Sequence, residues 1–333
     1  MERNALVDNL KGYACFLVLF GHVIMGVRQA GVPVPFFFEG LEQFIWSFHV
    51  PLFLFLSGVV YELTGRWRGK KTRGRFILHK LLSLGVPYVV FSAVYILVNT
   101  VAGGTNTEYT LTDILGIWHT PVAQYWFLYA LFFLFCIWAL LSDVLPNWVI
   151  TLLTVAVSYL VPLFGGSLGC FGVVFDAAIA FGLGTCVPFA KLEKPAAPIK
   201  WGVVAAHVAA GITLIVLGKI EAPFFKELML LFGIYAAILL ISMVQKVGIL
   251  ARILRFMNRY SFQIYLLHTV FTAGTRIALL RFGITQWWIH VVLGTAAGLG
   301  CSTLCAIIAK RIPALNFFFF PTQYLKKKNA QGV

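Results

Sequence analysis

Long apolar runs, separated by short polar segments, fill almost the whole chain. A helix needs about 20 apolar residues to cross a hydrocarbon core of about 30 Å. Runs near this length occur at 6–27, 43–63, 82–102, 124–142, 148–164, 171–190, 201–218, 228–245, 261–280 and 287–309, the shortest being 148–164. The pattern predicts an all-α fold, a polytopic membrane helix bundle of about ten transmembrane helices.

The composition excludes a soluble globular protein. Of the 333 residues, 60% are hydrophobic and 11% are charged, and the mean hydropathy is +0.88. Soluble domains have a charged fraction of about 25%. The lipid bilayer is therefore the first partner that the sequence predicts.

The net charge of +14 reflects topology rather than nucleic-acid binding. If the N-terminus is cytoplasmic, most of the 26 lysines and arginines fall in segments on the cytoplasmic side. Basic residues are enriched in cytoplasmic loops, so both termini are predicted inside the cell. We expect no nucleic-acid partner.

No segment looks like a linker to a soluble domain, and the first apolar run looks like a retained span rather than a cleaved signal peptide. We therefore expect a single membrane domain over 1–333 without a fused soluble domain. The six cysteines are scattered and form no close pair, so we expect no metal site and no bound cofactor.

The first run contains three ionisable residues, Asp8, Lys11 and His22. At 100° per residue, Lys11 and His22 lie about 20° apart around a helix and about 16 Å apart along it, and Asp8 falls on the same stripe. Charged groups inside a membrane are costly and usually mark a functional path. Charges that extend to the interface at a helix end would explain Asp8 and also Lys11, but His22 lies too deep for that explanation.

The second run contains His49, then Pro51 and the pair Ser57-Gly58. Proline and glycine loosen a membrane helix and allow close approach of its neighbours. His49 is either a site residue or a histidine that forms an interhelical hydrogen bond; the pattern does not separate the two.

Later runs add Trp126, Ser261 and His268. Trp126 begins the fourth run from the outside, a position that an aromatic interface belt also explains. Ser261 and His268 lie about two turns apart on one helix face.

Taken in order, these segments resemble the acyltransferase 3 family of integral membrane acyltransferases. Lys11 stands where the family usually has arginine, which keeps the charge but loses the planar two-pronged donor. The second arginine that often follows the position of Lys80 is absent. The matching positions are Asp8, Leu10, Lys11, Gly12 and His22, then Phe48 to Gly58, Arg75 to Tyr88, Trp126 to Leu128, and Asn258, Ser261 and Ile264 to His268.

The resemblance implies a protein of ten spans with both ends inside, in a bacterial cytoplasmic membrane. It also implies transfer of an acyl group, usually acetyl, from cytoplasmic acetyl-CoA to a hydroxyl of a cell-surface or lipid-linked glycan. Acyl-CoA would be the donor substrate and the glycan the acceptor; succinyl is the alternative acyl group.

The resemblance also suggests roles for the residues. His22 would be the catalytic residue, as a general base for the acceptor hydroxyl or as a transient acyl carrier. The basic loop 66–80 would attract the anionic donor. Acyl-CoA-binding residues would be Lys11, Arg73, Arg75 and Lys80, with Asp8, Lys11, His49, Ser57, Trp126, Ser261 and His268 in support.

A function of another class fits the same pattern. A glycan or small-solute exporter could use His22, His49 and His268 as an intramembrane proton path.

Overall fold

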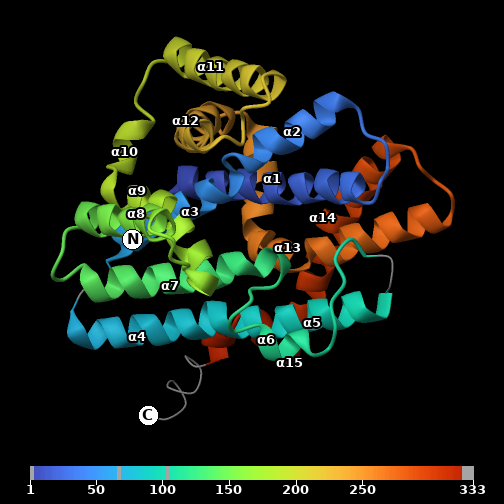
Figure 1. Ribbon diagram of the computed structural model, residues 1–333, viewed down its shortest axis with the longest axis horizontal. Helices are drawn as coiled ribbons and strands as arrows, with labels where there is room; N and C mark the ends of the chain where they lie inside the picture. Colours follow the sequence, from blue (N-terminus) through green and yellow to red (C-terminus); the bar gives the residue numbers. More distant parts are fainter. Residues whose placement is uncertain (1–3, 66–68, 103–104, 325–333) are drawn as a thin grey trace. The chain divides into compact units, whose positions relative to one another are not determined.

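The computed structural model describes residues 4–65, 69–102 and 105–324, and within these ranges the chain is helical without a β-strand (Figure 1). The prediction of an all-α, polytopic membrane helix bundle is confirmed. The helices are α1 (Ala5–Gln29), α2 (Phe36–Trp46), α3 (His49–Thr64), α4 (Lys70–Lys80), α5 (Val86–Ala102), α6 (Asp113–Gly116), α7 (Trp126–Leu141), α8 (Asn147–Leu163), α9 (Gly172–Cys186), α10 (Phe189–Leu192), α11 (Ala197–Val216), α12 (Pro223–Val244), α13 (Gly248–Arg281), α14 (Trp287–Arg311) and α15 (Pro313–Phe319).

Most of the predicted spans correspond to long apolar helices. In the described part of the chain, eight helical segments are long and apolar enough to cross a membrane. The shortest predicted span, 148–164, is the 17-residue helix α8. The predicted span 261–280 lies within the 34-residue helix α13. The number of crossings and the side on which each terminus lies stay predictions.

The second predicted span is divided near its start. Helix α2 begins before the predicted boundary at residue 43, the chain turns at Ser47 and Phe48, and α3 begins at His49. Pro51 therefore lies in the first turn of α3, where a missing backbone N–H breaks no helical hydrogen bond. The break places Trp46 and His49 on either side of one short turn.

The basic segment predicted as a loop over 66–80 is helical from Lys70, so that prediction is wrong for this part. Lysine and arginine are good helix formers, and a helix that leaves the hydrocarbon can keep its hydrogen bonds in water. A π-helical turn, Leu81–Gly85, joins α4 to α5, and Figure 1 shows the three as one continuous helix. Pro87 supplies no N–H to the carbonyl four residues before it, which favours this local change of register. Arg66 and Arg68 lie outside the described residues.

The chain forms two compact units, each built from two stretches of sequence. Residues 1–56 and 188–304 form unit 1, and residues 57–187 and 305–333 form unit 2. The boundaries fall inside α3 and α14.

In unit 1, α1 and α13 pack closely along their length. A Cβ atom on Gly12 would lie 2.2 Å from the carbonyl oxygen of Leu254, so glycine is needed for this approach. Three residues later on α1, the thiol of Cys15 lies 3.7 Å from the carbonyl oxygen of Ser261. The contact positions rise together along both helices, so α1 and α13 run parallel.

That parallel pairing sets a condition on topology. Two helices that cross a membrane in the same direction have an odd number of crossings between them. The predicted spans between α1 and α13, from 43–63 to 228–245, meet this condition only if the short helix α8 is counted as a crossing.

In unit 2, α7 packs against α4 and the π-helical turn, and α8 packs against α9. Gly58 on α3 has a packing reason: a Cβ atom there would lie 2.0 Å from the carbonyl oxygen of Phe181 on α9. Gly182, next to Phe181 on α9, likewise leaves room for the side chain of Thr151 on α8.

Candidate active site

Three histidines that are distant in sequence gather in unit 1. The rings of His22 on α1 and His268 on α13 meet edge to face, with centroids 5.0 Å apart. Trp46 lies 5.2 Å from His22 and 5.0 Å from His49, centroid to centroid. We call His22, Trp46, His49 and His268 the histidine cluster.

Each histidine of the cluster is held by a backbone carbonyl close in sequence, on its own helix for His22 and His268 and on α2 for His49. The Nδ1 atom lies 2.8 Å from the carbonyl oxygen four residues earlier, which is Val18 for His22, Ile45 for His49 and Ile264 for His268. A carbonyl oxygen only accepts, so Nδ1 carries the hydrogen in the neutral ring. The Nε2 atom of each ring is then left with a lone pair that can accept a proton.

The three histidines differ in burial. His49 and His268 are fully buried, whereas His22 keeps intermediate exposure. The Nε2 atoms of both buried histidines, and Nε1 of Trp46, have no hydrogen-bond partner within the described ranges. Buried polar atoms normally have such a partner. The cluster therefore combines buried acceptors and one buried donor with a half-buried histidine.

The local sequence explains why these side chains meet. Because α1 and α13 run parallel in close contact, the seven-residue spacing from Cys15 to His22 matches that from Ser261 to His268. The turn after α2 adds Trp46 and His49. The hydroxyl of Ser47 donates to the carbonyl of Phe44 at 2.7 Å within this turn.

A buried arginine lies one helical turn beyond His22. Arg276 is 7% exposed and donates from Nη1 to the carbonyl oxygen of Gly26 at 3.2 Å. A side chain at Gly26 would exclude it, because a Cβ atom there would lie 2.7 Å from Nη1. Close by in sequence, Arg28 donates two hydrogen bonds to the carboxylate of Glu42 and joins α1 to α2.

Sequence reasoning missed Trp46 and Arg276 as parts of this region. A signal existed for Arg276, which follows His268 by eight positions, about two turns farther along the same helix. Trp46 and His49 lie on different helices, so their spacing gave no such signal. Neither belongs to the motifs of the resemblance.

The other residues of the predicted stripe lie on the same helix as His22. Asp8, Lys11 and His22 are all partly exposed, whereas most residues between them are buried. Asp8 lines a cavity with residues of α13. The hydroxyl of Ser261 donates to the carbonyl of Asn258 on its own helix at 3.0 Å.

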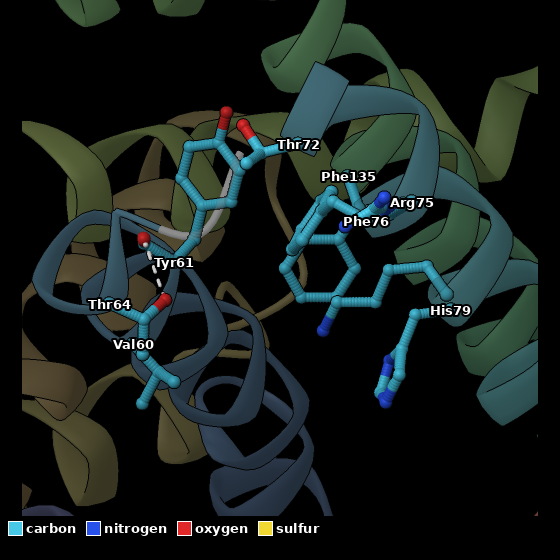
Figure 2. A pocket seen from close by; sticks show the side chains of 9 residues that line it. Val60, Tyr61, Thr64, Thr72, Arg75, Phe76, His79 and Phe135 are labelled. Carbon is cyan, nitrogen blue, oxygen red and sulfur yellow. Dashed lines mark hydrogen bonds between the residues drawn. The ribbon is translucent and has the colours of Figure 1, made fainter. Parts of the chain in front are cut away.

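Unit 2 contains a separate basic pocket of about 290 Å³, shown in Figure 2. The ammonium group of Lys80 lies 3.5 Å from the ring centroid of Phe135 and 5.3 Å from that of Phe76. Arg75 and His79 are exposed at its edge. The pocket is lined by Val60, Tyr61, Thr64, Thr72, Arg75, Phe76, His79, Lys80 and Phe135.

Arg73 does not line this pocket. Its guanidinium forms an ion pair with Asp143, just after α7. Ser57 and Trp126 also belong to unit 2, where each is half-buried. The structure thus brings Arg75 and Lys80 together, and gives Arg73 a different partner.

No group of three His, Cys, Asp or Glu side chains within the described ranges is arranged to hold a metal ion.

Comparison with known families gives a match over most of the chain. The family model, described as an acyltransferase domain of the acyltransferase 3 type, covers residues 4–307. The match includes the whole histidine cluster and the residues of the basic pocket. No curated protein and no solved structure matches the chain.

Proposed function

The chain belongs to the acyltransferase 3 family, and we propose that it transfers an acyl group from cytoplasmic acyl-CoA to a hydroxyl of a cell-surface or lipid-linked glycan. Membership makes it an integral membrane acyltransferase. We propose acetyl as the acyl group because it is the commonest in the family, and a bacterial cytoplasmic membrane as the location.

In the proposed reaction, His22 is the general base. Its Nε2 atom takes the proton of the acceptor hydroxyl while the hydroxyl oxygen attacks the thioester carbonyl of the donor. The tetrahedral intermediate collapses, the carbon–sulfur bond breaks, and the thiolate of CoA receives the proton from His22. The hydrogen bond from Nδ1 to Val18 supports this role because it leaves the lone pair on Nε2.

The buried members of the cluster would position His22 and the acceptor. The His268 ring meets the His22 ring edge to face and limits its orientation. Trp46 Nε1 and the Nε2 atoms of His49 and His268 are buried polar atoms that a glycan hydroxyl could satisfy.

A covalent route uses the same atom. If Nε2 of His22 attacked the thioester itself, an acyl-histidine would form and CoA would leave before the glycan arrived. Rapid denaturation at neutral pH of the enzyme with labelled acetyl-CoA and no acceptor distinguishes the routes, because only the covalent route leaves label on His22.

On the donor side, we propose that Arg75 and Lys80 attract the anionic CoA, with Lys11 nearer the thioester. The basic pocket supports this proposal through its unequal charge: Arg75, His79 and Lys80 line it, and no carboxylate does among the residues that the structure describes. For Arg73 we propose a weaker role, because Asp143 already offsets its charge.

The observation that carries the proposal is the pairing of His22 with His268 in a chain of this family. We expect His22→Ala to lower the transfer rate about 100- to 10,000-fold, the usual contribution of a general base. The measurement is transfer of labelled acetyl from acetyl-CoA to extracted surface glycan by the purified protein in proteoliposomes.

The matched control is His119→Ala, because His119 is an exposed histidine in the segment before α7. It should keep wild-type activity. If His22→Ala folds, as judged by an unchanged melting temperature, and still transfers acetyl at the wild-type rate, the role of His22 is refuted.

The closeness of the three histidines also favours the exporter as a second function, since a proton could pass along the cluster. Uptake of labelled glycan into inverted vesicles that requires a pH gradient and no acyl-CoA would favour export. Acetyl transfer in detergent, without any gradient, would favour the acyltransferase.

A further inference from the structure

A second polar cavity lies between the early parts of α1 and α13. Its volume is about 620 Å³, within the range of about 300–1,000 Å³ that is usual for ligand sites. The same two helices carry His22 and His268 farther along. The cavity is lined by Ala5, Asp8, Asn9, Arg255, Asn258 and Arg259.

The two arginines favour a phosphate ligand. Arg255 and Arg259 are four residues apart on α13, so their side chains lie on one face, and both are exposed. A guanidinium group binds phosphate oxygens with two parallel hydrogen bonds, which makes arginine well suited to this ligand.

The lining also contains hydrogen-bond acceptors, which a phosphate group without donors cannot satisfy. Asn9 is 3% exposed, and its Nδ2 atom donates to Oε1 of Gln245 at 2.9 Å. Its Oδ1 atom is buried without a hydrogen-bond partner in the part of the chain that the structure describes. Asp8 and Asn258 add further acceptors to the lining. The ligand that fits carries phosphate groups together with N–H or O–H donors.

We propose that this cavity binds the phosphorylated nucleotide end of the acyl-CoA donor, with Arg255 and Arg259 on its phosphates and Asn9 and Asp8 on its amino or hydroxyl groups. The inference rests on the proposed function. A CoA molecule has a pyrophosphate and a separate 3′-phosphate, which gives the two arginines two anionic groups to bind.

The spacing along the helices agrees with this assignment. From Asp8 to His22 the helical rise is about 21 Å, and from Arg259 to His268 it is about 14 Å. The pantetheine arm of CoA is an extended chain with two amide units, which spans roughly 15–20 Å by the dimensions of such chains. When the nucleotide end of acyl-CoA lies in the cavity, the thioester at the other end of the pantetheine arm can therefore lie near the histidine cluster.

Phosphatidylethanolamine shares the relevant chemistry, because its headgroup combines a phosphate with an ammonium donor. The experiment must therefore separate the donor from the lipid. Binding of CoA and of dephospho-CoA is measured by calorimetry on the full-length protein in nanodiscs of phosphatidylcholine alone, and again in nanodiscs with phosphatidylethanolamine.

The test variant is Arg255→Gln/Arg259→Gln, and the matched control is Arg252→Gln, an exposed arginine of α13 that does not line the cavity. We expect the double variant to weaken CoA binding at least about 10-fold, the usual loss for hydrogen bonds to a charged group. The control should stay within about 2-fold, since an exposed charge contributes little. Asn9→Ala should weaken CoA binding by a smaller factor.

An unchanged affinity for CoA in the double variant would overturn the inference. The inference would also be overturned if the double variant lost CoA affinity only in nanodiscs with phosphatidylethanolamine. That result would assign the cavity to the lipid. Failure of the proposed function can be told apart from failure of this inference. In that case CoA would still bind through Arg255 and Arg259, but no acyl group would be transferred to a glycan.

Discussion

The histidine cluster and the basic pocket differ in how deeply their polar side chains are buried and in what fixes those side chains in place. In the cluster, each ring is buried or half-buried and hydrogen-bonded to the backbone carbonyl four residues earlier in the chain. In the pocket, Arg75 and His79 are exposed, and Lys80 lies over the aromatic ring of Phe135.

The difference matches what each region is proposed to do. Proton transfer needs an atom fixed within hydrogen-bonding distance of its target, so rigid support is useful. Attraction of an anion acts over several ångströms and tolerates mobile side chains. If this comparison is right, substitutions in the two regions should differ both in size and in the kinetic constant that they change.

The largest effect is expected from Gly12→Ala, which acts on the support of the cluster. The new Cβ atom would overlap the carbonyl oxygen of Leu254, a backbone atom that cannot move without moving α13. We expect a loss of stability of about 3 kcal/mol, at the upper end for overpacked sites, and near-complete loss of activity. The melting temperature of the detergent-solubilised protein measures the first, and acetyl transfer measures the second.

Gly274→Ala is the matched control, because this glycine lies on α13 and a Cβ atom there meets nothing within 4 Å. It should leave the melting temperature unchanged or raise it slightly, since alanine favours helix. Equal effects of the two substitutions would show that close packing of α1 on α13 does not support the site.

The next effect in size is expected from His268→Phe, which keeps a ring against His22 but removes both nitrogen atoms. We expect kcat to fall about 10- to 100-fold, as for a misplaced catalytic group, with little change in KM for acetyl-CoA. His268→Gln, which keeps a polar amide, should recover part of the rate. A change in KM with unchanged kcat would contradict the positioning role.

The smallest effects are expected in the basic pocket. Lys80→Ala should raise KM for acetyl-CoA about 10-fold without changing kcat, because a charged contact to phosphate is lost. Arg73→Ala should change KM less than about 2-fold, since Arg73 already pairs with Asp143. Steady-state kinetics over a range of acetyl-CoA concentrations measures both. If Arg73→Ala has the larger effect, the distinction between the pocket-lining Lys80 and the ion-paired Arg73 is wrong.

The sequence was sufficient for the fold class and for part of the site. Apolar runs of span length identify membrane helices without knowledge of their neighbours, which is why the bundle could be predicted. His22 stood out because an ionisable residue deep in an apolar run is costly. Its ring contact with His268 could not be predicted, because periodicity describes one helix at a time.

Other features depend on contacts that no single run encodes. Trp46 resembles an interface aromatic until the turn at Ser47 and Phe48 places it between two histidines. The charged segment before span three suggests a loop, but from Lys70 it extends a helix. The partner of Arg73 lies 70 positions away on another helical hairpin, at Asp143, and charge pairs over such distances follow from the tertiary fold alone.

The π-helical turn Leu81–Gly85 also affects how the family should be compared. Such a turn contains one residue more than an α-helical turn, so the faces of α4 and α5 are offset by about 100° relative to an uninterrupted helix. Relatives that lack the extra residue would present a different face of α5 beneath the same basic stretch. An alignment of this chain with such a relative would need a one-residue gap here. Helix faces assigned by a seven-residue repeat from Arg75 into α5 would otherwise be wrong.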